Sequence, residues 1–166
     1  VLKPIHGRDP EFYKAIVSHA AQDYTEFEIL FGTTDPQDAA LPGIRRLQRE
    51  FPGRRIEIVI VQTDAPNAKV GVLAELARRA RYPLILVNDS DIVVGPGYFR
   101  AVTAPLAHPA VGMVSLFLPP PAPSPAAPRM SPRAGRRADA RPHLARLDDA
   151  GGRRRLSASA VHRSRA

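Results

Sequence analysis

The sequence predicts an α/β domain in which a mostly parallel sheet carries helices on both faces. Over residues 1–118, strand-like and helix-like segments alternate as β-α-β-α-β-α-β-α-β with short connections. Residues 83–87 form a nearly continuous apolar run, which is typical of a strand buried on both faces. The helical segments have one apolar and one charged face, so they can cover such a sheet.

Turn and capping residues delimit the first elements. The apolar strand that starts the chain ends by Gly7, and Asp9 with Pro10 then opens a helix. Residues 26–31 alternate in side-chain character as a strand does. An amphipathic helix over residues 41–51 follows, and Pro52-Gly53 stops it.

The later elements continue the same order. Residues 55–62 are rich in β-branched side chains and predict a strand, and residues 69–81 predict a helix with a cationic last turn. After the buried strand at 83–87 come a helix at 96–106 and a strand at 111–118. Because ligands of open parallel sheets bind where the strands end, we expect the site at that edge.

The last 48 residues differ in composition from the rest. The net charge of the 166-residue chain is +8, and residues 119–166 hold all of this excess as 11 Arg, no Lys and 3 Asp. This segment consists mainly of Ala, Arg, Pro, Ser and Gly, and it lacks the apolar surface that would offset the entropy of ordering. We therefore predict two parts, a folded region over 1–118 and a disordered tail over 119–166.

The change of composition has two open interpretations. It falls in or just after an apparently buried strand, whereas a domain boundary would follow that strand's partners. One interpretation is out-of-frame translation from about residues 115–119 onward, and the other is a genuine basic tail. The chain already resembles a strand at Val1, so we expect a fragment that begins inside a domain.

Several classes of protein are excluded. The chain has no cysteine, which excludes disulfide scaffolds, zinc–thiolate sites and thiol nucleophiles. No apolar run approaches the roughly 20 residues that span a bilayer. Neither G-x-G-x-x-G nor the P-loop pattern occurs. The arginines at 153–155 have no aromatic platform beside them, so we expect no specific nucleic-acid binding.

Asp89-Ser90-Asp91 is the sharpest candidate for chemistry. Its two carboxylates directly follow the buried strand and can approach one divalent cation. Mg²⁺ and Mn²⁺ prefer oxygen ligands and commonly bridge protein carboxylates to substrate phosphates. The alternative is an ordinary solvated turn with surface acids.

Asp35 and Lys69 follow other strands of the predicted sheet. A carboxylate at Asp35 could accept hydrogen bonds from a base or from ribose hydroxyls, and the alternative is a local Asx-Pro turn. Lys69 opens a helix, where its charge and free N–H groups could hold an anion together. The alternative for Lys69 is a solvated surface lysine.

Taken together, these segments resemble the family 21 glycosyltransferases, which include ceramide glucosyltransferase and bacterial enzymes associated with hopanoid biosynthesis. The resemblance covers about residues 1–115 and lies in several motifs in the right order. The matching segments are residues 1–7, 21–24, 28–32, 35–38, 67–70, 88–94 and 111–114.

The resemblance implies a truncated GT-A fold, which is Rossmann-like, and a glycosyltransferase activity. Family members carry out metal-assisted, inverting transfer of a sugar from a UDP-sugar, such as UDP-glucose or UDP-N-acetylglucosamine, to a membrane lipid such as ceramide or a hopanoid-type acceptor. Carried over by position, Asp35 would contact the uridine, and Asp89 and Asp91 would hold the nucleotide and a Mg²⁺ or Mn²⁺ ion. The remaining donor-binding residues would be Pro4, Lys69 and Ser90.

The sequence also departs from the family pattern. The family's later "E-D" and "(Q/R)-x-x-R-W" motifs have no counterpart after residue 118, and the chain has no Trp. We therefore assign no catalytic residue and expect this chain to be incomplete and inactive. The family's membrane-spanning segments are also missing, although the resemblance implies a membrane-associated parent with a cytoplasmic catalytic domain. The alternative is a stand-alone nucleotide- or metal-binding module with a basic interaction tail.

Overall fold

The computed structural model describes residues 1–117 and 158–163, which lie in one compact unit. Over residues 1–117, the elements of this unit alternate as the sequence predicts. In chain order they are β1 (Leu2–Pro4), α1 (Phe12–Ala20), β2 (Glu28–Thr33), α2 (Leu41–Glu50), β3 (Arg55–Ile60), α3 (Ala68–Arg79), β4 (Leu84–Val87), α4 (Tyr98–Thr103), the 3₁₀ turn η1 (Ala104–Ala107), β5 (Met113–Phe117) and β6 (Ala158–Arg163).

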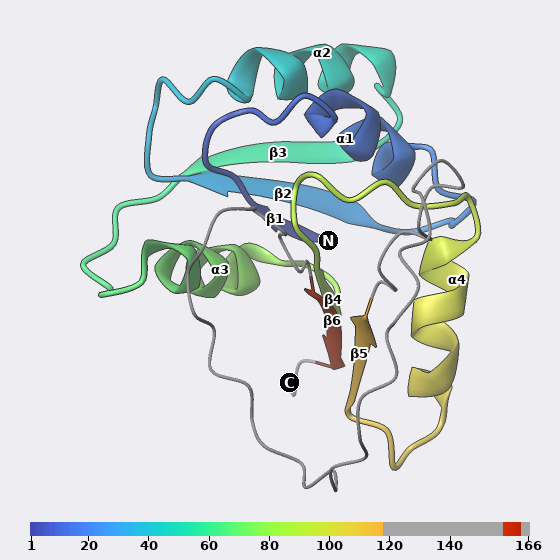
Figure 1. The fold of residues 1–166 in the computed structure, drawn as a ribbon. Helices are drawn as coiled ribbons and strands as arrows, with labels where there is room; N and C mark the ends of the chain where they lie inside the picture. Colours follow the sequence, from blue (N-terminus) through green and yellow to red (C-terminus); the bar gives the residue numbers. More distant parts are fainter. Residues whose placement is uncertain (118–157, 164–166) are drawn as a thin grey trace, which may run out of the picture. The chain divides into compact units, whose positions relative to one another are not determined.

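The strands form one sheet in the order β3-β2-β1-β4-β6-β5 (Figure 1). β1 pairs in parallel with both β2 and β4, and β2 pairs in parallel with β3. β6 runs antiparallel to β4 on one side and to β5 on the other. The prediction of a mostly parallel sheet is therefore confirmed.

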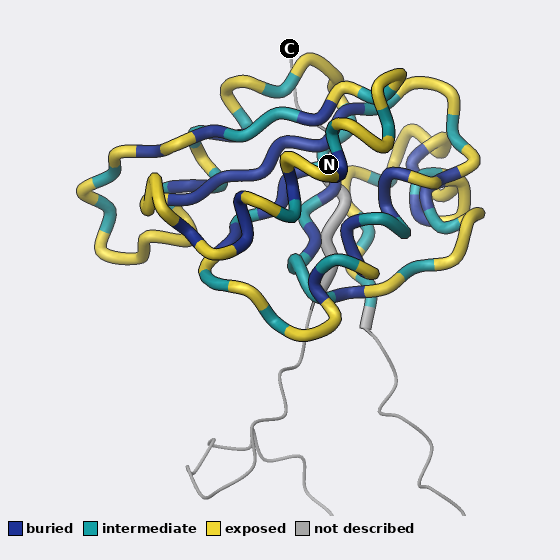
Figure 2. Tube along the Cα trace, turned by 90° about the horizontal axis from the view of Figure 1, so that it is seen from above, coloured by how far each residue is buried: buried dark blue, intermediate teal, exposed yellow. Residues whose placement is uncertain are grey.

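Helices cover both faces of the sheet, because successive side chains of a strand point to opposite sides. On β2, Ile29 and Phe31 pack with residues of α1 and α2, whereas Leu30 packs with residues of α3. On β4, Leu86 packs against α4, and its neighbour Ile85 packs with the α3 side. Figure 2 shows the buried positions concentrated along the central strands, with exposed positions in the loops between elements.

β6 differs from what the composition of the tail predicts. Residues 158–163 form a strand, although this stretch shows no clear alternation of polar and apolar residues. A strand inserted between β4 and β5 gains backbone hydrogen bonds on both sides, and backbone pairing does not depend on side-chain pattern. Residues 118–157 and 164–166 lie outside the described residues, so the tail boundary at 118 and its two interpretations stay predictions.

The helices of the described region are short. The longest of them, α3, has 12 residues. Within residues 1–117 and 158–163, no helix combines the length and the hydropathy that a bilayer crossing requires.

Gly32 allows α3 to approach the sheet closely. A Cβ atom at this position of β2 would lie 2.5 Å from Cγ1 of Val72 and 3.0 Å from Cδ1 of Leu76, both on α3. Val72 is β-branched and buried, so it has little freedom to move away. The close packing of α3 on β2 therefore depends on the missing side chain.

We predict that Gly32→Ala lowers the free energy of unfolding by about 1–3 kcal/mol, because the added methyl group overpacks a filled core. Urea denaturation followed by circular dichroism measures this change. Gly53→Ala is the matched control, since a Cβ atom added at Gly53 would meet no surrounding atom within 4 Å. Equal effects of the two substitutions would contradict the packing argument.

Candidate functional site

The carboxyl ends of β1 to β4 meet at one edge of the sheet, because these strands are parallel. The loops that leave this edge contain most of the charged residues that the sequence analysis selects. Asp35 follows β2, Lys69 begins α3 after β3, and Asp89 follows β4. The prediction that these strand exits open on the same edge of the sheet is therefore confirmed.

Lys69 and Asp89 form an ion pair across this edge. The Lys69 Nζ atom lies 2.6 Å from Oδ1 of Asp89. Asn67 caps α3 by accepting a hydrogen bond from the Val70 amide at 3.3 Å, which places Lys69 in the first turn of the helix. The structure therefore brings together two residues that are 20 positions apart in the sequence.

This ion pair is accessible to solvent. The side chains of Lys69 and Asp89 are 55% and 27% exposed. An exposed ion pair contributes only about 0–1 kcal/mol, since solvent screens it and its long side chains lose entropy. The Lys69 ammonium can therefore be displaced from Asp89 by a competing cation at low cost.

Ser90 and Asp91 complete the turn after β4, and both are half-buried. Within the part of the chain that the structure describes, no cluster of three or more His, Cys, Asp or Glu side chains is arranged to hold a metal. The two carboxylates of the turn still fit a hard divalent cation, because Mg²⁺ is commonly bound by one or two carboxylates together with waters and substrate phosphates.

Asp35 and Pro4 lie at the same edge but make local contacts. The Asp35 Oδ1 atom accepts a hydrogen bond from the Gln37 amide at 2.8 Å, which is the Asx turn that the sequence analysis left open. The Asp35 side chain is exposed, so this turn leaves it accessible to a ligand. Pro4, in β1, pairs in register with Gly32. Among the described residues, no hydrogen bond joins either residue to Asp89.

Lys3 contacts the turn after β4, and the sequence analysis did not select it. Its side chain is fully buried, and its Nζ atom donates hydrogen bonds to Oδ1 of Asn88 at 3.2 Å and to the Asp89 carbonyl oxygen at 2.9 Å. Burial lowers the Lys3 pKa to about 7, although the nearby charges of Asp89 and Asp91 oppose this shift. A lysine inside an apolar strand was the signal available in the sequence.

Residues of α1 and of the loop after it hold the segment downstream of the turn. Gln22 is buried, and its Nε2 atom donates to the Gly95 carbonyl at 2.6 Å while its Oε1 accepts from the Phe99 amide at 3.0 Å. Ser18 Oγ accepts from the Val94 amide at 3.1 Å. These long-range contacts anchor residues 94–99 to α1.

Asp38 is a buried carboxylate with a structural role. Its Oδ2 accepts from the Gly7 amide at 2.9 Å, and its Oδ1 accepts from the Ala40 amide at 2.8 Å. These bonds join the loop after β1 to the loop after β2 and support the start of α2. Backbone amides thus occupy both oxygens of this carboxylate, which leaves little hydrogen-bonding capacity for a ligand.

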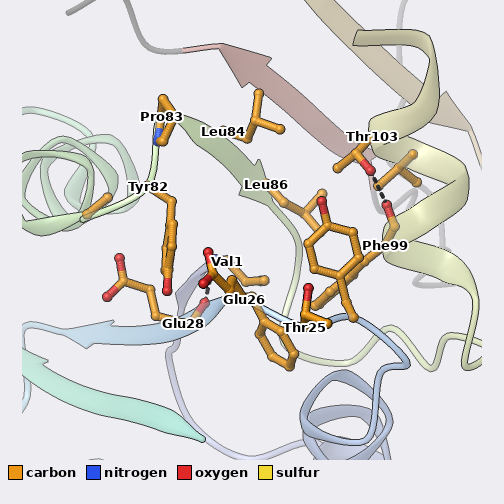
Figure 3. Close-up of a pocket in the computed structure, with 14 residues that line it drawn as sticks. Val1, Thr25, Glu26, Glu28, Tyr82, Pro83, Leu84, Leu86, Phe99 and Thr103 are labelled. Carbon is orange, nitrogen blue, oxygen red and sulfur yellow. Dashed lines mark hydrogen bonds between the residues drawn. The ribbon is translucent and has the colours of Figure 1, made fainter. Parts of the chain in front are cut away.

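A pocket of about 290 Å³ lies at the other end of the sheet (Figure 3). It is lined by residues at the amino ends of three strands, Val1, Glu28 and Leu84, and by Phe99 of α4. None of the residues predicted to bind donor or metal lines this pocket. The assignment of the candidate site therefore depends on the chemistry of the loops at the carboxyl edge.

Comparison with solved structures identifies the fold. The chain is similar to a mannosyltransferase from Pyrobaculum calidifontis in complex with GDP-Man and Mn²⁺, with a TM-score of 0.60 and 20% sequence identity. The match covers 68% of this chain and 33% of that chain. The described sheet and its helices thus form a GT-A fold, as the sequence predicts.

The chain belongs to glycosyl transferase family 21, whose family model matches residues 1–120. Ceramide glucosyltransferase 1 of Caenorhabditis elegans is 35% identical over 112 residues, covering 65% of this chain and 24% of that protein. Ceramide glucosyltransferase 3 of the same species is 29% identical over 117 residues, covering 69% of this chain and 26% of that protein. The chain spans about a quarter of the length of these curated relatives.

His19 of α1 is another buried titratable group. Its side chain is fully buried beside the rings of Tyr98 and Phe99, and its Nδ1 atom lies 2.9 Å from the Ala15 carbonyl oxygen. Its Nε2 atom has no hydrogen-bond partner among the described residues. Burial, together with the positive charge of Lys3, lowers the His19 pKa to about 3.

We predict that His19 makes the fold less stable in acid. Between about pH 6.5 and pH 3 the unfolded chain binds a proton that the folded chain excludes, so stability falls as the pH falls through this range. The slope from this one group is about 1.4 kcal/mol per pH unit. Denaturation curves across this range should therefore show that the free energy of unfolding depends less steeply on pH in His19→Phe than in the wild type.

His6→Phe provides the matched control, because His6 is exposed. This substitution should leave the pH dependence of stability close to that of the wild type. A wild-type slope retained in His19→Phe would contradict the buried, neutral state of His19.

Proposed function

We propose that this chain is the donor-binding region of a glycosyltransferase, which binds a nucleoside diphosphate sugar together with a divalent cation. The observation that carries the proposal is the ion pair between Lys69 and Asp89, whose charged atoms lie 2.6 Å apart where the parallel strands end. This ion pair occurs in a chain that belongs to glycosyl transferase family 21. A cationic and an anionic group that meet at the carboxyl edge of a parallel sheet suit a ligand that is itself a cation–diphosphate pair.

Each of the predicted residues would contact a different part of the ligand. Asp89 and Asp91 would hold Mg²⁺ or Mn²⁺, and Asp35 would accept hydrogen bonds from the uridine. Pro4 and Ser90 would contact the rest of the donor. When bound, the cation supplies charge neutralisation of the diphosphate, on which negative charge develops as the sugar departs.

Lys69 would change partner when the ligand binds. In the structure its ammonium neutralises Asp89, and the pair is exposed enough to exchange. With a divalent cation held by Asp89, the Lys69 ammonium would be free to neutralise the diphosphate. The amino end of α3, where Lys69 lies, favours an anion by its dipole and its free amides.

The reaction of a protein that carries this region would be inverting transfer of the sugar from a UDP-sugar to a membrane lipid. The ceramide glucosyltransferases that match the chain support ceramide as the acceptor class, and a hopanoid-type lipid is the other candidate. The GDP-Man and Mn²⁺ of the similar mannosyltransferase support a nucleotide sugar and a divalent cation. We also propose that such a protein works at a membrane with its catalytic domain in the cytoplasm.

Transfer additionally needs a base that deprotonates the acceptor hydroxyl. None of the residues in the candidate site is assigned that role, so we expect the chain to bind donor without transferring the sugar. The proposal is therefore tested by binding. Calorimetry with UDP should show binding that depends on Mn²⁺ or Mg²⁺.

We predict that Asp89→Asn and Asp91→Asn each weaken cation-dependent UDP binding about 10-fold or more, because each removes a charged ligand. Asp23→Asn is the matched control, since Asp23 is an exposed carboxylate that pairs with Arg100 before β2. UDP binding that is independent of the cation, or unaffected by both substitutions, would contradict the proposed site.

We predict that Lys69→Met has opposite effects on two ligands. It should tighten the binding of Mn²⁺ alone, because it removes the competing charge on Asp89, and it should weaken the binding of UDP in saturating Mn²⁺. Electron paramagnetic resonance of free Mn²⁺ and calorimetry measure the two affinities. Lys14→Met makes the same chemical change at an exposed lysine that pairs with Glu11, and it should alter neither.

A further inference from the structure

We infer that Lys3 is a positioning residue that fixes the turn at residues 89–91 in the conformation that binds the cation and the diphosphate, an inference that rests on the proposed function. Lys3 belongs to β1 and not to any loop of the candidate site. Its side chain nevertheless reaches the backbone of Asp89 with a hydrogen bond of 2.9 Å.

The backbone pairing between β1 and β4 is short. The register pairs Leu2 with Val87, and the Asn88 amide donates to the Leu2 carbonyl at 3.3 Å. The Lys3 side chain continues this connection beyond the ladder, since its Nζ bonds to Oδ1 of Asn88 and to the carbonyl of Asp89. Lys3 thus replaces backbone pairing at the point where the strand becomes the site loop.

Lys3 holds the backbone of Asp89 and leaves its carboxylate available. The carboxylate Oδ1 instead pairs with Lys69. Asn88, which Lys3 orients, donates from Nδ2 to the Tyr98 hydroxyl at 3.2 Å and so ties the turn to α4. With Gln22 anchoring Gly95, the turn is held on both of its flanks.

Burying a lysine side chain in order to hold a turn costs free energy. Removing the ammonium takes this donor away from the buried Asn88 side chain and from the Asp89 carbonyl, and losing a hydrogen bond to a buried polar group is costly. By charge alone, however, an ammonium this close to Asp89 and Asp91 would oppose a cation. A positioning role therefore predicts that the loss of Lys3 weakens cation binding, whereas its charge alone predicts that the loss strengthens cation binding.

The test substitutes Lys3→Met in the full 166-residue chain, with Mn²⁺ as the probe. Positioning predicts Mn²⁺ affinity weakened about 10- to 100-fold, the usual effect of losing an outer-shell partner of a metal ligand. This is opposite in sign to the effect expected for Lys69→Met. Hydrogen exchange of the amides at 89–92 should also become faster. If Lys3→Met does not fold, Lys3→Gln, which keeps an N–H donor on a shorter side chain, takes its place.

Glu28→Gln is the control for a general loss of stability. Glu28 is buried at the amino end of β2, where it accepts from the Arg81 amide and pairs with Arg55. This substitution should lower the melting temperature without changing Mn²⁺ affinity or exchange at 89–92. Comparable changes at the turn in Glu28→Gln would show that Lys3 acts only through overall stability and would overturn the inference.

The remaining outcomes separate the inference from the proposed function. Unchanged or tighter Mn²⁺ binding by Lys3→Met, with an unchanged turn, overturns the inference and leaves the proposed function intact. If the wild-type chain does not bind Mn²⁺ while Lys3→Met selectively speeds exchange at 89–92, Lys3 positions the turn but the proposed function is wrong.

Discussion

The parallel pairing of β1 with both β2 and β4 is the constraint on which the rest of the described structure depends. It sends the ends of these strands, and of β3 beyond β2, to one edge of the sheet. It buries β1 so completely that a lysine in it must find partners inside the protein. Those partners are the first residues after β4, so the same pairing that organises the core also organises the candidate site.

The candidate site combines a well-anchored backbone with weakly held charges. Asn88, Gln22 and Asp38 are buried and hydrogen-bonded to the loops at or near the edge. Asp35, Lys69 and Asp89 keep part of their side chains in solvent. Such a division suits a site in which the protein fixes where ligand atoms lie, while cations and anions exchange at its surface. The 290 Å³ pocket at the opposite edge is lined by none of Asp35, Lys69 and Asp89.

Much of the fold was predictable because its signals are local. The apolar run at 83–87 and the stop at Pro52-Gly53 each specify an element or its end without reference to the rest of the chain. The strand-exit rule likewise selected Asp89 and Lys69, which the structure pairs. Lys3 and Gln22 were not selected, because their importance comes from partners 73 to 86 positions away that only the folded chain brings close. β6 was missed since backbone pairing, and not side-chain pattern, accounts for it.

The most direct test is to locate the bound cation by paramagnetic NMR. Mn²⁺ would be added in small amounts to the isotope-labelled chain in the presence of UDP, and the broadening of each amide signal would be measured. The account predicts that the amides of residues 89–91 broaden first, followed by those near Asp35 and Lys69. Broadening centred on Glu26 and Glu28 at the opposite edge, or spread evenly over the chain, would contradict a cation–diphosphate site at the carboxyl edge.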